Sequence, residues 1–240
     1  MKGTRPLTPK EIKQVYDAFD GKCLIRNRAL FQLGISCGAR ISELLALLIG
    51  DVYQNGAAVT DLLFKKNIVK GGEVSRAVPL NADGRSAIDA LINWHQADYG
   101  SIPQQRVLFP SRVGQGNCAM SRQYAHQVLK DAFEKAGLNG KLATHSLRKS
   151  YAQRLYTATG DIYCVQEMLG HKSVETTQAY LGVDYQKLRS ASDEMVIFSE
   201  NKQKGIKGIS DDTLLIELAR RGFDIGDLVS QKERNQTHAA

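Results

Sequence analysis

Several features that would place a chain in a common structural class are missing from this sequence. No uninterrupted apolar run reaches about 18 residues, which excludes a membrane-spanning helix of ordinary length. The first residues lack the pattern of a secretory signal peptide, and no internal repeat is visible. No group of carboxylates has the spacing of metal ligands, so the sequence does not predict a metal centre.

Cysteine is scarce, and the spacing of the cysteines argues against two further classes of protein, zinc-binding and disulfide-rich. The chain has four cysteines, which lie far apart and form no C-x-x-C pair. This pattern indicates neither a zinc site nor a disulfide framework. We therefore expect Cys23, Cys37, Cys118 and Cys164 to be buried, reduced thiols of a cytosolic protein.

The composition is that of a folded, basic protein. In 240 residues, 42% are apolar, enough to bury a sizeable core, and the formal charge is +7 with a pI near 9.2. Residues 201–240 contain seven Lys and Arg against six Asp and Glu, so the excess lies in the first 200 residues. Such a balance favours an anionic partner, most commonly nucleic acid.

The first third of the chain combines helical and strand-like patterns. Thr8, Pro9 and Glu11 have the spacing of a capping box with proline at the first helical position, which predicts a helix start. Gly71-Gly72 has the character of a tight hairpin turn. The expected helices lie at 24–37, which ends at Gly38, and at 41–48, and the expected strands lie at 59–64 and 74–78.

Helical periodicity dominates the remainder. Thr144 and Asp161 are expected to cap helices, and Ser173 is expected to open a short one. The expected helices lie at 84–99, 121–136, 144–158, 161–170, from 173 past Tyr180, at 184–195 and at 210–221, with a polar linker at 199–209. The sequence therefore predicts a mainly α fold with a small antiparallel β-sheet, of the α+β class.

Four short stretches contain side chains that could take part in a reaction. They are G-A-R-I-S-E-L at 38–44, T-H-S-L-R at 144–148, L-G-H at 169–171, and Tyr180. Each also has an ordinary structural interpretation. In H-x-x-R one side chain can face the core and the other solvent, Arg40 can complement the carboxyl end of a helix, and Tyr180 can be a core aromatic. It is the combination of the four stretches that indicates a catalytic site.

These residue types together suit attack on a phosphodiester. Arginine is always charged, and its planar fork can hold the non-bridging oxygens, so Arg40 and Arg148 can stabilise the charge that develops there. A phenol has a pKa of about 10 and must lose its proton as it attacks. His145 is the candidate base for Tyr180.

In their order and spacing the four stretches resemble the signature boxes of the tyrosine recombinases, the phage integrase family, over roughly residues 8 to 195. The resemblance implies that Tyr180 is the nucleophile and forms a 3′-phosphotyrosine link with a free 5′-hydroxyl. It also implies that His171 hydrogen-bonds the phosphate, and that neither ATP nor a metal or other cofactor is needed. The implied fold is that of the family's catalytic domain, expected here at 1–198, with 199–240 as a linker and helical extension.

The family also implies a lysine at the tip of a β-hairpin that protonates the leaving 5′-oxygen. K-G-G-E-V-S-R-A-V-P-L at 70–80 matches that hairpin and points to Lys70, with Lys65 and Lys66 as competitors. Glu43 stands where the family carries an acidic residue, which implies that it orients Arg40 or a neighbour. The other interpretation of Glu43 is an exposed first-turn glutamate favoured by the helix dipole.

Further cations are candidates for phosphate contacts outside the active site, where they would set affinity and its salt dependence. Each can equally be a plain surface charge. The candidates are Arg76, Arg122, Lys141, Lys149 and Lys172. Tyr185 lies close enough in sequence to Tyr180 to be a rival nucleophile.

Two departures from the family pattern affect the expected partners. The pattern begins almost at Met1, so we expect no N-terminal DNA-clamping domain; the chain is then either a truncated form or similar to the short recombinases of fimbrial phase variation. An accessory DNA-binding protein is a possible requirement in that case. At the other end, 184–195 is a candidate helix for docking on a neighbouring subunit, and 210–221 either adds an oligomer contact or folds back.

The function that this resemblance implies is site-specific recombination of double-stranded DNA. The resemblance predicts a tetramer on paired sites, acting in the cytoplasm at the nucleoid, in the context of a mobile genetic element and without a membrane partner. Three alternatives stay open: an inert DNA-binding regulator with the same fold, a type IB topoisomerase-like relaxing enzyme, and, with least support, a metal-dependent nuclease.

Overall fold

The computed structural model describes residues 3–65 and 75–181, together with 190, 192, 193, 195, 216–218 and 220. The chain divides into two compact units, 1–183 and 184–240. In the second unit, residues 190, 192, 193, 216–218 and 220 are helical. The expected turn at Gly71-Gly72, most of the expected linker and tail, and the candidates Lys66, Lys70 and Tyr185 lie outside the described residues. A catalytic domain ending at 198 stays a prediction.

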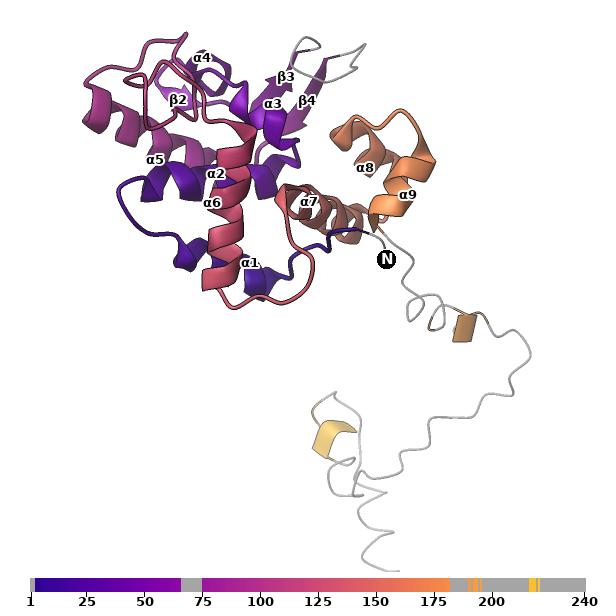
Figure 1. The fold of residues 1–240 in the computed structure, drawn as a ribbon. Coiled ribbons are helices and arrows are strands. Elements are labelled where there is room, and N and C mark those ends of the chain that lie inside the picture. The colour runs from indigo at the N-terminus through magenta and orange to yellow at the C-terminus, as the bar shows by residue number, and fades with distance from the viewer. Residues whose placement is uncertain are drawn as a thin grey trace, which may run out of the picture. The chain divides into compact units, whose positions relative to one another are not determined.

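In its described part, the first unit is built from helices and two short hairpins (Figure 1). Its helices are α1 Pro9–Ala18, α2 Leu24–Cys37, α3 Ile41–Leu45, α4 Ile49–Val52, α5 Ala82–Tyr99, α6 Arg122–Lys135, α7 Thr144–Thr159, α8 Ile162–Leu169 and α9 Val174–Leu181. Its strands are β1 Tyr53–Gln54, β2 Ala57–Ala58, β3 Asp61–Phe64 and β4 Arg76–Pro79, and they pair antiparallel as β1-β2 and β3-β4. The mainly α, α+β class is confirmed.

Local capping signals predicted several helix ends correctly. The Thr8 side chain accepts from the Glu11 amide while the Glu11 carboxylate accepts from the Thr8 amide at 2.8 Å, which completes the capping box. Asp161 accepts from the Tyr163 amide at the start of α8. Gly38 ends α2 in the left-handed conformation, with φ of 62°.

Two expected features of the helices were wrong. The helix expected over 41–48 ends at Leu45, and a new short helix begins at Ile49, because the Leu48 amide is capped by the Asp51 carboxylate at 3.0 Å. Thr144 does not cap α7 but is its first helical residue. The cap is Ala143, whose amide donates to the Ser146 hydroxyl at 3.2 Å.

The hairpin β3-β4 places alternate side chains in the core. Leu62 and Phe64 are buried, whereas Leu63 between them is exposed, and Phe64 pairs in register with Arg76. The hairpin β1-β2 was not expected from the sequence. Its signal was the Asn55-Gly56 dipeptide, whose residues have φ of 52° and 80°, as a two-residue hairpin turn requires.

Helix α2 passes between the two main core clusters. Leu30 and Leu33 belong to one cluster, and Phe31 and Ile35 to the other. Most residues of α2 are buried as a result, Arg26 and Asn27 among them, and the half-buried Arg28 and Gln32 lie one turn apart on the remaining side. A third cluster packs α8 and α9 on α7; it contains Ala152, Val165 and Leu169, with Tyr180 packed against it. This cluster fixes the position of Tyr180.

All four cysteines are free thiols, but only Cys37 is buried. Cys118 is exposed, and Cys23 and Cys164 are half-buried, so the expectation of four buried thiols was wrong. Burial raises the pKa of the Cys37 thiol to about 12. Among the helices that the structure describes, none combines the length and the apolar character needed to cross a membrane.

Candidate active site

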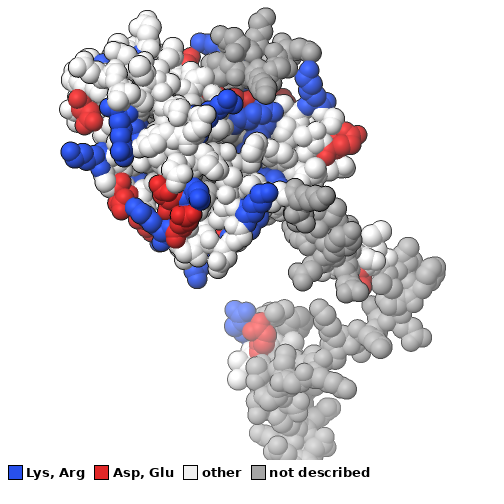
Figure 2. All heavy atoms as spheres, in the orientation of Figure 1, with Lys and Arg blue, Asp and Glu red and all other residues white. Residues whose placement is uncertain are grey.

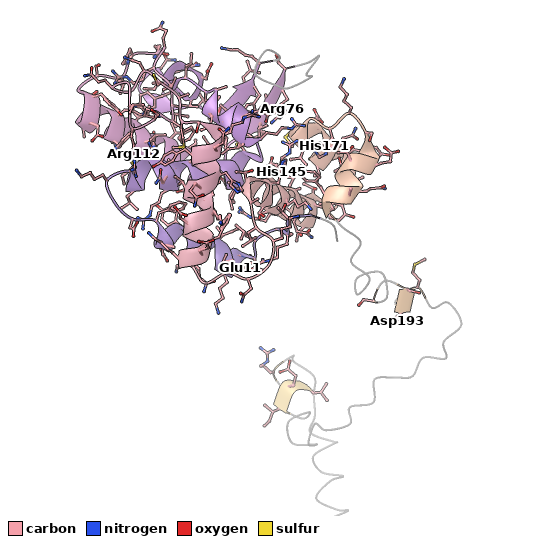
Figure 3. All side chains as sticks on the ribbon, in the orientation of Figure 1. Glu11, Arg76, Arg112, His145, His171 and Asp193 are labelled. Atoms are coloured by element: carbon pink, nitrogen blue, oxygen red, sulfur yellow. The ribbon has the colours of Figure 1, made fainter. Side chains whose placement is uncertain are left out.

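The predicted site residues converge where the end of α2, the start of α7 and the end of α8 meet. A cavity of about 290 Å³ lies there, with Arg40, His145 and Arg148 in its wall. In Figure 3 the labelled side chains of Arg76, His145 and His171 point into the same region, from β4, α7 and the turn after α8. Segments more than 100 residues apart in sequence thus share one site.

Arg148 lies on the floor of this region with a fully buried guanidinium, 1% exposed. Its two terminal nitrogens donate to main-chain carbonyls, to Gly38 O at 2.7 Å and to Leu169 O at 2.6 Å. Its Nε is buried and has no hydrogen-bond partner among the described residues. Burial, and then the charge of Arg40, lower the pKa of Arg148 to about 10, so it stays charged at neutral pH. A buried cation of this kind favours an anionic ligand.

Glu43 is the acidic centre of the site and is completely buried. Its carboxylate accepts from the Arg40 guanidinium at 2.8 Å and from Arg76 at 2.7 and 3.3 Å. Burial by itself would raise the pKa of Glu43, but the hydrogen bonds and charges of Arg76 and Arg40 outweigh it and hold the pKa below its usual value. The alternative of an exposed first-turn glutamate is excluded, and Glu43 contacts Arg40 as the family resemblance implied.

Arg76 does not occupy the surface position expected for a phosphate contact. Its side chain is only 9% exposed, and its guanidinium lies 4.5 Å from the centre of the Phe64 ring while it pairs with Glu43. No local pattern signals this pairing, because Arg76 and Glu43 are 33 residues apart and meet only in the folded chain. The expectation that Arg76 contacts DNA from the surface is therefore corrected.

Tyr180 lies beside the two histidines. Its hydroxyl is 3.1 Å from Nδ1 of His145, and its ring meets the His171 ring edge-on, with centroids 4.9 Å apart. The Arg148 guanidinium and the Lys149 ammonium lie 6.0 and 5.6 Å from the Tyr180 ring centre. Partial burial, followed by the charges of Arg148, Arg40 and Lys149, lowers the pKa of His145. A neutral imidazole in this position can accept the proton of the phenol.

His171 is held by a buried hydroxyl. Its Nδ1 is 3.0 Å from Oγ1 of Thr177, and Thr177 is completely buried. Burial, and then the charges of Arg148, Arg40 and Arg76, lower the pKa of His171 to about 4, so the ring is neutral at pH 7. When the Thr177 hydroxyl donates to Nδ1, the ring proton is on Nε2, from which it can be donated to a phosphate oxygen.

The other candidate cations occupy different surroundings. Arg122 is exposed and lines the cavity, Lys149 is half-buried next to Tyr180, and Lys141 and Lys172 are exposed. The ammonium of Lys65 is paired with Asp51 at 2.9 Å, which weakens Lys65 as a rival of Lys70. In Figure 2 basic atoms gather on the visible face near α3 and β4. The described residues contain no group of three side chains that could hold a metal ion.

Gly38 is required both for the turn after α2 and for the position of Arg148. Its φ is 62°, and a Cβ atom added there would fall on the ring of Tyr151. We expect Gly38→Ala to lower the free energy of unfolding by about 2–5 kcal/mol, because left-handed strain and overpacking add. Urea unfolding measures this loss.

Gly160→Ala is the matched control, since Gly160 ends α7 with φ of 68° and a Cβ there would meet nothing within 4 Å. It should cost only about 1 kcal/mol, the strain of the left-handed conformation alone. Equal losses in the two variants would contradict the assigned role of the Tyr151 contact.

Comparison with known proteins agrees with this geometry. The profile of the phage integrase family matches residues 5–187. The chain is 39% identical over 175 residues to the tyrosine recombinase XerD of Mycobacterium leprae (strain TN), covering 71% of this chain and 52% of that protein. It is 35% identical over 198 residues to XerC of Xanthomonas campestris pv. campestris (strain B100), covering 78% and 57%. The chain thus spans about half the length of the curated relatives it matches.

Solved structures give the same result. The XerH site-specific recombinase, bound to its difH substrate in a pre-cleavage complex, superposes with a TM-score of 0.60 at 28% identity, covering 80% of this chain and 55% of that one. The XerA recombinase superposes with a TM-score of 0.61 at 25% identity, covering 79% and 65%. By sequence and by fold, the chain belongs to the phage integrase family of tyrosine recombinases.

Proposed function

We propose that this protein is a site-specific recombinase that cleaves and rejoins DNA strands through a covalent link to Tyr180. The observation that carries the proposal is the 3.1 Å contact between the Tyr180 hydroxyl and the imidazole of His145, next to the buried cation Arg148. A phenol placed between a neutral base and a phosphate-binding arginine is poised for nucleophilic attack. The relatives named as recombinases support the same activity.

The cleavage step follows from these positions. The Tyr180 oxygen attacks the scissile phosphorus as its proton passes to Nδ1 of His145, and the bond from phosphorus to the 5′-oxygen breaks. The departing oxygen takes a proton, which we assign to Lys70 from its place in the family hairpin. One phosphodiester is exchanged for another, so a 5′-hydroxyl can reverse the step without ATP.

The remaining residues stabilise and orient the phosphate. Arg40 and Arg148 supply positive charge for the non-bridging oxygens, where negative charge grows during attack. His171, neutral and held by Thr177, donates a hydrogen bond to the same group and fixes its orientation. Glu43 holds Arg40 in place and does not itself react.

Double-stranded DNA is the proposed substrate and partner. Arg122, Lys141, Lys149 and Lys172 are the proposed phosphate contacts, which would give salt-dependent affinity without sequence choice. Assembly as a tetramer on paired sites, assistance by an accessory DNA-binding protein and action at the nucleoid belong to the same proposal. The structure of XerH with difH shows that this relative binds its own site.

A trapping experiment tests the proposed reaction. The protein is incubated in EDTA with nicked duplexes made from the DNA that flanks its coding sequence, and the products are run on a denaturing gel. A nick near the cleavage point releases a short fragment after attack, so the covalent adduct accumulates. We expect a DNA-linked protein band whose labelled peptide contains Tyr180. No adduct on a duplex that the protein binds would contradict the proposal and favour an inert DNA-binding protein.

A further inference from the structure

Arg76 belongs to the region of the site but does not line the cavity. It is the first residue of β4, and both of its terminal nitrogens donate to the Glu43 carboxylate, at 2.7 and 3.3 Å. The same carboxylate accepts from Arg40 at 2.8 Å. One buried carboxylate is therefore shared by two guanidinium groups, of which one reaches the cavity and the other stays beneath it.

The stem of Arg76 also packs against the turn that carries His171. A Cβ atom built on Gly170 would lie 3.2 Å from Cδ of Arg76 and 3.4 Å from its Nη1, so the side chain crosses directly over this glycine. Gly170 ends α8 in the left-handed conformation and precedes His171. The guanidinium also lies over the Phe64 ring of β3, 4.5 Å from its centre.

Arg76 thus touches three segments, and two of them support a part of the site. Through Glu43 it determines where the carboxylate that holds Arg40 can lie, and through Gly170 it contacts the residue before His171. The planar fork of arginine can bond both carboxylate oxygens and stack on an aromatic ring at the same time, which a lysine ammonium cannot do. The geometry requires arginine at this position and not merely a positive charge.

We propose that Arg76 is a positioning residue of the active site: it sets the orientation of Arg40 through Glu43 and braces the turn before His171. This inference rests on the proposed DNA cleavage by Tyr180. Arg76 itself touches neither the phosphate nor the reacting atoms. A displacement of about 1 Å in a catalytic group can cost about 100-fold in rate, so loss of such a brace is expected to affect the chemical step strongly.

The test compares Arg76→Gln, Arg76→Lys, Glu43→Gln and the double variant Glu43→Gln/Arg76→Gln. Arg154→Gln serves as the control, because Arg154 is an exposed arginine on α7 and its loss removes the same charge. Three quantities are measured: the single-turnover rate of adduct formation on the nicked duplex, the Kd for that duplex, and the equilibrium constant of urea unfolding. Rates are taken at a temperature where circular dichroism shows every variant folded.

For Arg76→Gln we expect an adduct rate about 100-fold lower with Kd changed by less than about threefold, and for Arg76→Lys a rate at least about tenfold lower. Glu43→Gln should change the unfolding constant much less when Arg76 is already replaced, because the two side chains are directly coupled. The double variant should therefore be about as stable as Arg76→Gln alone, and its adduct rate should be no higher than that of Arg76→Gln. Arg154→Gln should match the wild type.

Three results are decisive against the role of Arg76. An Arg76→Gln rate within about threefold of the wild type would overturn it, as would a double variant in which rate returns together with stability. Additive effects of the two substitutions on unfolding would also overturn it, because Arg76 would then not act through Glu43. Failure of the wild-type protein itself to form an adduct would contradict the proposed cleavage instead. The unfolding measurements would then still decide whether the two residues are coupled.

Discussion

Replacing Tyr180 by phenylalanine is expected to abolish the covalent DNA adduct and to leave DNA binding unchanged. The substitution removes only the hydroxyl that lies 3.1 Å from His145. The ring is retained, so its contacts with the α7–α8–α9 cluster and with the His171 ring persist, and the fold should be unaffected. We expect the rate of adduct formation to fall by a factor of about 10⁴ or more, as when the nucleophile of a catalytic unit is removed.

Two other tyrosines provide the controls for this experiment. Tyr163→Phe changes an exposed side chain, 68% accessible, on the same small helical cluster, and should form the adduct at the wild-type rate. Tyr185→Phe tests the rival nucleophile directly. Adduct from Tyr180→Phe together with its loss in Tyr185→Phe would reverse the assignment. Filter binding of the duplex by all three variants checks that binding is intact.

Arg148→Lys is expected to lower the rate of adduct formation by about 1000-fold although the charge is kept. The terminal nitrogens of Arg148 reach carbonyls at the ends of α2 and α8 simultaneously, and its remaining N–H groups stay available for a ligand. A lysine ammonium is a single point and cannot span the two carbonyls while it also contacts a phosphate. The rate on the nicked duplex, measured with saturating DNA, gives the effect on the chemical step.

In Arg148→Lys, an effect on the stability of the fold has to be distinguished from an effect on the rate of the chemical step. Arg26→Lys offers the matched comparison, because Arg26 is also 1% exposed and is held by Pro110 O and the Asn27 side chain, yet it does not line the cavity. Both variants should unfold at lower urea concentration, since each leaves buried carbonyl groups poorly satisfied. Only Arg148→Lys should lose the adduct rate. An equal loss of rate in both would show that the effect of Arg148 is only structural.

The sequence predicted those parts of the molecule whose signals are local. The capping box at Thr8, the cap at Asp161 and the glycine that ends α2 were all correct, because each depends on residues within one turn of helix. The break of the helix after Leu45 was missed. Besides the local cap of the Leu48 amide by Asp51, Leu48 forms an antiparallel bridge with Val107, and this contact between residues distant in sequence has no local signal.

The same distinction applies to the site. The four motifs identified Arg40, His145 and Arg148, which line the cavity, and also His171 and Tyr180, which the structure places beside them. The shared burial of Glu43 and Arg76 could not be predicted, since a glutamate in the first turn of a helix and an arginine after a turn are usually exposed. The two charges meet in the interior only in the folded chain, where β4 packs on α8 and Arg76 at its start reaches Glu43 of α3.

The attachment of Arg148 to main-chain oxygens has a consequence for how this protein can vary in evolution. A carbonyl of the backbone persists whatever side chain its residue carries, so most substitutions at position 169 leave the acceptor chemically intact. Point mutations of the residues that bind Arg148 therefore leave its hydrogen-bond acceptors in place. Arg40 differs, because its acceptor is the side chain of Glu43, which a single base change can remove. The substitutions that would disturb Arg148 are instead those that change the path of the main chain, above all at Gly38, whose carbonyl accepts from Arg148. Sequence drift is therefore expected to be freer around Arg148 than around Arg40.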